Sequence, residues 1–257
     1  MRIAAYQFDV TGDINNNLSI MKNAVKEAKD EGADLIVFCE CALTGYIKRD
    51  VDDLKELDRV CIDKSINAIG QMSVNYNISI ITGSIAFDTN CYNRAYLFTP
   101  NGKIDWYDKR ALYGWDEETF ICGDKKGIFE LDGLKIGLRI CFEVRFPEYF
   151  RELYIEDTDL DIVLFYDVSD TDDTERYELM MSHLKTRAVE NVTPVLSVNS
   201  IRPYQTAPTC FIDRSGKVIC ECKRNETRML IIDHDKKDYD FGEKGRKLYS
   251  DRLLGLE

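Results

Sequence analysis

The segment that decides the fold is GLRICFEVRFPE, residues 137–148. Its first half predicts a buried strand that leads directly into Cys141. Pro147 suits the first turn of a helix, so the chain turns from strand to helix within a few residues. At such a corner, backbone N–H groups and the field of a helix terminus favour a thiolate. We therefore predict a reactive thiol at Cys141, the alternative being one more buried cysteine among the nine in the chain.

Outward from this segment, the apolar pattern switches repeatedly between the two-residue period of strands and the 3.6-residue period of helices. Helices are expected after a cap at residues 15–17, over residues 52–72, from Pro147 onward and over residues 174–190. Strands are expected at residues 2–8, 35–38, 78–85, 95–98, 103–107, 128–131, 135–140, 162–165, 195–198, 209–212, 217–222 and 229–232. Hairpin signals such as residues 100–102 (PNG) favour mixed sheets over a purely parallel sheet. We predict an α/β chain that forms one domain over residues 1–257.

Composition narrows the class of protein. The 257 residues are 44% hydrophobic and 31% charged, enough to bury a sizeable core and too apolar for a disordered chain. The net charge of −12 argues against nucleic acid and anionic membranes as partners. No apolar run reaches the ~18 residues of a membrane span, and the first ten residues lack the pattern of a signal peptide. We therefore expect a cytoplasmic protein with reduced cysteines.

Several common chemistries lack support. The two histidines are His183, within a predicted helix, and His234, within a charged run, which argues against a Cys–His or Ser–His pair. The motifs of nucleotide-binding loops and of the serine nucleophile elbow are absent. No CxxC occurs, and the thiols of residues 39–41 and 220–222 alternate as in strands, so we expect no zinc site.

Two other polar residues end predicted strands. Glu40 follows the apolar run at residues 35–38, and burial there would raise the pKa of its carboxyl group. A carboxylate with a raised pKa suits a general base. Lys109 similarly places a cation at the end of the strand at residues 103–107.

These segments together resemble the three signatures of the nitrilase (carbon–nitrogen hydrolase) superfamily, in its amidase-like branch. The matches are residues 33–40 (ADLIVFCE) with 43–46 (LTGY), residues 107–109 (YDK), and residues 137–148. They follow the family's order and cover essentially the whole chain. The resemblance implies a four-layer α-β-β-α sandwich with two mixed sheets.

The resemblance also implies a Glu–Lys–Cys triad. Cys141 would be the nucleophile, Glu40 the general base and Lys109 the cation beside the oxyanion, with the backbone N–H of Phe142 as a second oxyanion donor. Many members carry a second glutamate between the lysine and cysteine motifs. Glu117 is preferred for that role over Glu118, the alternative being a solvated acidic turn. No metal or organic cofactor is required.

The resemblance further implies a homodimer in which the segment at about residues 241–257 reaches across the interface. Substrate contacts are less defined. Arg145 would bind a substrate carboxylate or form an internal ion pair that braces the corner. Tyr46 and Trp115 are further candidates to line the pocket, although core packing also explains a tryptophan. The acidic run at residues 167–175 would bind an amine or form a solvated loop.

Three departures from the family pattern leave the substrate open. Cys39 replaces a common proline, residues 110–112 (RAL) follow the lysine where a histidine and an apolar residue are common, and Phe142-Glu143 replace a common Tyr-Asp pair. We predict an amide hydrolase that acts on a small amide or N-carbamoyl compound through a cysteine thioester and releases ammonia. A nitrile hydrolase and an N-acyltransferase with the same triad are alternatives. A non-catalytic binding or regulatory protein is an alternative of another class. So is a thiol redox sensor, with Cys39 as the resolving cysteine.

Overall fold

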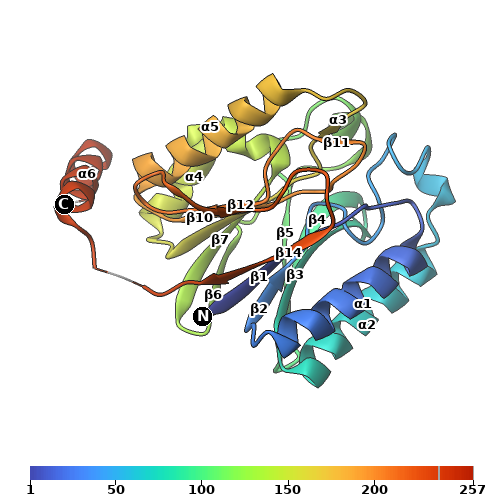
Figure 1. Cartoon of the computed structure of the whole chain (residues 1–257). Coiled ribbons are helices and arrows are strands. Elements are labelled where there is room, and N and C mark those ends of the chain that lie inside the picture. The colour runs from blue at the N-terminus through green and yellow to red at the C-terminus, as the bar shows by residue number, and fades with distance from the viewer. Residues whose placement is uncertain (237, 257) are drawn as a thin grey trace.

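Two six-stranded sheets pack face to face, and a pair of helices covers the outer face of each (Figure 1). The computed structural model describes residues 1–236 and 238–256. The observed layers confirm the predicted four-layer sandwich with two mixed sheets in a single domain.

The first sheet has three parallel strands flanked by antiparallel ones. Its strands, in spatial order, are β14 (Arg228–Asp233), β1 (Arg2–Gln7), β2 (Leu35–Val37), β3 (Ser79–Phe87), β4 (Cys91–Phe98) and β5 (Ile104–Asp108). Strands β1, β2 and β3 are parallel to one another. All three residues of β2 are buried, as its continuous apolar run predicts.

The second sheet repeats this pattern. Its strands, in spatial order, are β13 (Val218–Glu221), β12 (Cys210–Ile212), β10 (Val195–Val198), β8 (Leu160–Leu164), β7 (Leu134–Ile140) and β6 (Ile128–Leu131). Here β7, β8 and β10 are parallel, and the hairpins at the sheet's two sides are antiparallel. A third, small sheet pairs β9 (Val168–Ser169) with β11 (Tyr204–Gln205).

Helices α1 (Ile14–Asp30) and α2 (Arg59–Tyr76) cover the first sheet, and α4 (Pro147–Ile155) and α5 (Thr174–Asn191) cover the second (Figure 1). The predicted helix over residues 52–72 is wrong at its start. Residues Leu54–Glu56 form a separate 3-10 turn, η1, and α2 begins only at Arg59. The reason is local, because Asp53 and Asp58 each accept hydrogen bonds from the backbone just after them and so start two elements instead of one.

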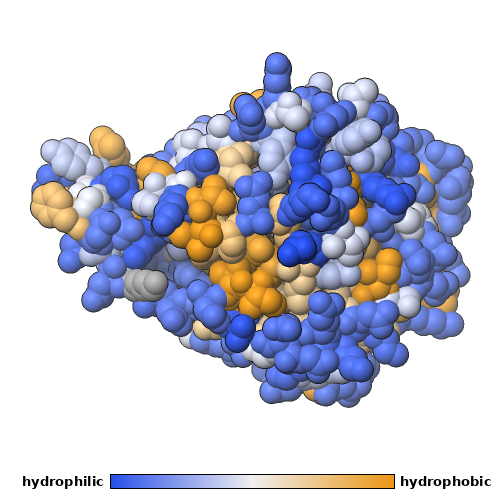
Figure 2. All heavy atoms as spheres, in the orientation of Figure 1, coloured by the Kyte–Doolittle hydropathy of each residue, from blue (hydrophilic) through white to orange (hydrophobic). Residues whose placement is uncertain are grey.

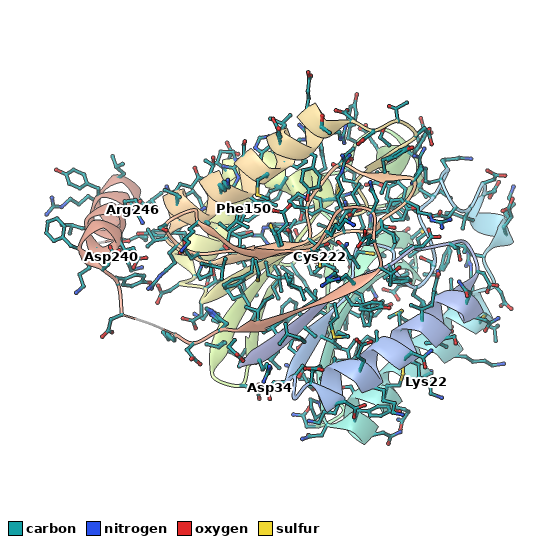
Figure 3. All side chains as sticks on the ribbon, viewed as in Figure 1. Lys22, Asp34, Phe150, Cys222, Asp240 and Arg246 are labelled. Atoms are coloured by element: carbon teal, nitrogen blue, oxygen red, sulfur yellow. The ribbon has the colours of Figure 1, made fainter. Side chains whose placement is uncertain are left out.

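One apolar cluster runs between the two sheets, and a smaller one lies between the second sheet and its helices. Phe150 of α4 belongs to the smaller cluster and points between its helix and the sheet (Figure 3). Within the described residues, no helix combines the length and the apolar character that a bilayer crossing requires. The two clusters hold the ends of the central strands in fixed positions.

One buried acid is not part of any ion pair within the described residues. Asp161, on β8, is fully buried, and one of its carboxyl oxygens accepts a hydrogen bond of 2.7 Å from Thr158. The other oxygen has no partner in the described part of the chain. Gly137 lies against it, since a Cβ at that position would come within 2.7 Å of the carboxyl oxygen. Burial raises the pKa of Asp161 to about 7, so the neutral acid is the form that this site favours.

We predict that Asp161 makes folding stability fall as pH rises. Its pKa is about 7 in the fold and about 3.9 in an unfolded chain. The folded state therefore binds the extra proton between these values, and stability declines by about 2 kcal/mol from pH 5 to pH 7. The free energy of unfolding in urea should not show this decline with pH in Asp161→Asn. Asp124→Asn, which replaces an exposed acid, should keep the decline. Parallel stability curves for wild type and Asp161→Asn would contradict the assignment.

Candidate active site

The three predicted functional residues come together where strands of both sheets end. Glu40 lies in the turn after β2, Lys109 directly follows β5, and Cys141 directly follows β7. The Lys109 Nζ lies 2.8 Å from Oε1 of Glu40, and both side chains are buried. The charges of Glu40 and Lys109 both act on the Cys141 thiol. The structure therefore brings an acid, an ammonium and a sulfur into one site.

Glu40 is held by three donors from three elements. Oε1 accepts hydrogen bonds from Asn93 Nδ2 at 2.7 Å and from Lys109, while Oε2 accepts one from the backbone N–H of Tyr166 at 2.7 Å. The turn that carries Glu40 packs directly on β3 at Gly83, where a Cβ would lie 2.6 Å from the Glu40 Cα. Only glycine leaves room for this approach. Oε2 retains a lone pair for a further proton donor.

The carboxylate on the far side of Lys109 belongs to Asp116 and not to Glu117. Asp116 lies on the short helix α3 (Trp115–Thr119), and its Oδ2 is 2.6 Å from Lys109 Nζ. Its Oδ1 accepts a hydrogen bond of 2.7 Å from the Tyr46 hydroxyl. Glu117 and Glu118 are exposed, because successive helical residues point about 100° apart and only one of the three acids faces inward.

Cys141 opens the 3-10 turn η2 (Cys141–Arg145) with φ of +45°, a conformation uncommon outside glycine. Glu143, in the same turn, is buried and holds it in place. One of its oxygens accepts a bond of 2.7 Å from the Ile140 N–H, and the other accepts bonds from the Tyr107 hydroxyl at 2.6 Å and the Arg110 N–H at 2.8 Å. Glu143 thus ties the turn of Cys141 to Tyr107 and Arg110, which lie on either side of Lys109 in the sequence. Strain of this kind is characteristic of active-site turns.

Electrostatics keep the thiol protonated in the resting site. Burial and the nearby Glu40 carboxylate raise the pKa of Cys141 well above its ordinary value, and Lys109 only partly offsets them. The expectation that the corner favours a thiolate is therefore wrong, because the buried acid outweighs the backbone field. Burial also raises the pKa of Glu40, as predicted, so Glu40 is a stronger proton acceptor than an exposed glutamate. Burial alone would lower the pKa of Lys109, but Glu40, Cys141 and Asp116 hold it well above its usual range.

The remaining predicted site residues lie in different environments. Phe142 follows Cys141 in η2, and the first N–H groups of a helical turn have no acceptor within it, so its N–H stays a predicted oxyanion donor. Tyr46 stacks on Tyr166 with ring centroids 5.0 Å apart and bonds Asp116 through its hydroxyl, so its hydroxyl supports the acid. Trp115 is half exposed beside Asp116. The Arg145 guanidinium lies 5.9 Å from the Phe142 ring centroid and has no ion-pair partner among the described residues.

Cys39 is fully buried, and burial raises the pKa of its thiol. A resolving cysteine needs an accessible thiolate, so the site does not favour the redox-sensor alternative.

The described residues contain no group of three or more His, Cys, Asp or Glu side chains placed to hold a metal ion.

Sequence reasoning missed three residues of the site. Asn93 and Glu143 are buried polar side chains within or just after apolar strands, and a polar residue at an inward position was the available signal. Asp116 adjoins two other acids, and nothing in their spacing to Lys109 identified which one points inward. Only the position of α3 relative to β5 decides it.

Comparisons with known proteins identify the family of this chain. Residues 2–241 match the family model described as carbon–nitrogen hydrolase. The chain belongs to the carbon–nitrogen hydrolase family. It is 29% identical over 234 residues to the 2-oxoglutaramate amidase of Bacillus subtilis (strain 168), covering 87% of each chain. It is 25% identical to an (R)-stereoselective amidase from Pseudomonas sp, covering 93% of this chain and 89% of the relative.

Among solved structures, an amidase from Nesterenkonia sp. AN1 in complex with butyramide superposes with a TM-score of 0.84. It is 20% identical and covers 100% of this chain and 96% of its own. At that identity the likeness shows the fold. The family match and the amidase relatives confirm the prediction of an amidase-type carbon–nitrogen hydrolase.

We predict that Asp116, and not Glu117, is required for turnover by this carbon–nitrogen hydrolase. Asp116→Asn removes the charge that holds Lys109 in place, and loss of one oxyanion donor costs about 10²–10³ in kcat. Ammonia release from small aliphatic amides should therefore fall about 100-fold in Asp116→Asn and stay within about twofold in Glu117→Gln. Thermal unfolding of both variants checks that they are folded. A large loss of activity in Glu117→Gln, with little loss in Asp116→Asn, would show that Glu117 is the required acid.

Proposed function

We propose that the protein hydrolyses the carbon–nitrogen bond of small amides or N-carbamoyl compounds through a thioester on Cys141. The observation that carries the proposal is the buried Lys109 ammonium between the carboxylates of Glu40 and Asp116, beside the Cys141 thiol. An ammonium fixed in a dry site stabilises negative charge that develops on a carbonyl oxygen. The amidase relatives support amides, ahead of nitriles, as the substrate class.

In the acylation step, Glu40 accepts the Cys141 proton as the sulfur attacks the carbonyl carbon. The carbonyl oxygen becomes an oxyanion, stabilised by the Phe142 N–H and by Lys109. An ammonium has three N–H donors, and two of those on Lys109 point to Glu40 and Asp116, which leaves the third for the substrate. Protonated Glu40 then gives its proton to the leaving nitrogen. The carbon–nitrogen bond breaks, ammonia or an amine departs, and the acyl group remains on Cys141.

Deacylation repeats these roles with water in place of the thiol. Glu40 takes a proton from the water molecule as its oxygen attacks the thioester carbon, and Lys109 again stabilises the oxyanion. The carbon–sulfur bond breaks and the sulfur regains the proton from Glu40. A carboxylate therefore performs the proton transfers that a histidine performs in other cysteine hydrolases.

The proposal predicts that Cys141→Ala abolishes ammonia release and leaves the fold intact. The measurement is a screen over aliphatic amides, ω-amides, N-carbamoyl compounds and nitriles, with Cys141→Ala as the blank. Adding hydroxylamine to the wild type should divert the thioester to a hydroxamate, because the amine competes with water. Ammonia release that persists in Cys141→Ala would overturn the thioester mechanism. A preference for nitriles would instead indicate a nitrile hydrolase, and a preference for amine acceptors over water would indicate an N-acyltransferase.

We also propose a homodimer that buries helix α6 (Phe241–Leu254). The helix stands apart from the sandwich, and it bears the labelled residues Asp240, its N-cap, and Arg246 (Figure 3). Polar contacts hold it to α4, where the Tyr154 hydroxyl donates to Asp251 at 2.5 Å. Apolar side chains nevertheless face outward on α6 (Figure 2), among them Phe241 at 96% exposure and Leu253 at 86%. Exposed apolar surface of this extent is typical of an interface.

All nine cysteines are free, which supports a cytoplasmic location.

The dimer predicts a specific response to charge on α6. Leu253→Glu should convert a dimer to a monomer, because burying an unpaired carboxylate costs several kcal/mol. Val60→Glu on α2, at a similarly exposed apolar residue, should leave the dimer unchanged. Light scattering after size exclusion measures both masses. A wild-type protein that is monomeric at micromolar concentration would rule out the interface.

A further inference from the structure

Three aspartates of the acidic segment at residues 167–173 form ion pairs with arginines from elsewhere in the chain. Asp167 pairs with Arg176, and Asp170 pairs with Arg49. Of the other two aspartates, Asp172 pairs with Arg224 and Asp173 caps α5 by accepting from the Arg176 N–H. Each carboxylate is therefore engaged within the protein, which does not favour an amine-bearing substrate at this segment. What the segment presents is a set of positioned guanidinium groups.

Arg176 is linked to the nucleophile. Its partner Asp167 directly follows Tyr166, whose N–H bonds Glu40, and the Asp167 side chain is buried. Nε and Nη2 of Arg176 lie 2.9 and 3.1 Å from the two oxygens of Asp167, and the Thr206 hydroxyl donates to the same carboxylate at 2.5 Å. The charges of Asp167 and Arg176 both interact with the Cys141 thiol. The pair thus lies within electrostatic reach of the Cys141 sulfur, to which the acyl part of a substrate would be bound.

The Arg176 guanidinium keeps donors available. A guanidinium has five N–H donors in a planar fork, and Asp167 engages one edge of it. No other side chain in the described part of the chain accepts from its Nη1, and 46% of the side chain is exposed. An arginine fixed on one edge by a buried carboxylate presents its other edge in a fixed orientation, the geometry that binds a carboxylate through two hydrogen bonds.

Arg145, which the sequence left open between a substrate contact and an internal ion pair, has a different setting. Its guanidinium lies 5.9 Å from the Phe142 ring centroid. Burial, Arg145 and Arg187 together lower the pKa of His183 on α5. The charge of Arg145 is not among the main influences on the Cys141 thiol. The observations therefore favour Arg176 over Arg145 for contact with a substrate group near the nucleophile.

We infer that Arg176 forms an anion-binding subsite and that the preferred substrates are amides whose acyl part carries a carboxylate. The inference rests on the proposed function, since it places the anionic group relative to an amide held at Cys141. The site already holds Glu40, Asp116 and Asp167 against Lys109 and Arg176, so no excess of positive charge attracts an anion. Recognition depends instead on the directed N–H groups of Arg176.

The test compares two amides of similar length, anionic glutaramate and neutral valeramide. Wild type should have the higher kcat/KM for glutaramate. Arg176→Gln should raise KM for glutaramate about 10- to 100-fold beyond any change with valeramide, the size expected for a lost hydrogen bond to a charged group. Unpairing the buried Asp167 acts on both amides alike, so the comparison removes that contribution. Arg176→Lys should recover part of the loss. Lys185→Gln removes the same charge from an exposed position of α5 and should change neither substrate.

A second measurement separates this inference from the proposed function. Glutarate binding to Cys141→Ala, measured by calorimetry, needs no turnover and should weaken in the double variant with Arg176→Gln. A wild-type preference for valeramide, an equal loss with both amides in Arg176→Gln, or glutarate binding that ignores Arg176 would overturn the subsite. If wild type releases ammonia from neither amide while glutarate still binds through Arg176, the proposed function fails and the subsite stands.

Discussion

The structure depends on one buried ammonium. Lys109 is 2% exposed and lies between Glu40 and Asp116 at 2.8 and 2.6 Å. Desolvating an ammonium costs several kcal/mol unless opposite charges surround it, and removing one partner of such a group costs about 3–5 kcal/mol. Because Glu40 follows β2, Lys109 follows β5 and Asp116 lies on α3, this requirement joins three segments that are distant in the sequence. The same charges then act on the Cys141 sulfur.

Around the ammonium, buried polar groups convert strand ends into a rigid site. Glu143 joins the turn of Cys141 to the segment that contains Lys109, and Asn93 and the Tyr166 N–H orient Glu40. The contacts of Glu143 and of the Tyr166 N–H cross from one sheet to the other, so the separation of Cys141, Glu40 and Lys109 follows from how the sheets pack. A departure from the family pattern, Phe142-Glu143 in place of Tyr-Asp, therefore preserves an acid that braces the corner.

The electrostatics explain how a site with little histidine can transfer protons. Burial raises the pKa of both Cys141 and Glu40, so the resting site holds a neutral thiol next to a carboxylate of increased basicity. Proton transfer then accompanies attack on the substrate, and no exposed thiolate persists to be oxidised. The Asp167–Arg176 pair adds two further charges that act on the same sulfur.

The sequence alone determined the α/β class, most strand positions and the identity of Glu40, Lys109 and Cys141 as the residues to bring together, because local periodicity and signature segments are properties of neighbouring residues. It misplaced the start of α2, where two successive aspartate caps act. It preferred Glu117 among the acids, and it left Arg145 open between a substrate contact and an internal ion pair. Only the tertiary structure places Asp116 against Lys109 and pairs Arg176 with Asp167. Which of three adjacent acids reaches Lys109, and which arginine approaches Cys141, depends on how α3 and α5 dock on the sheets. Docking is governed by contacts between residues far apart in the chain, which no local pattern records.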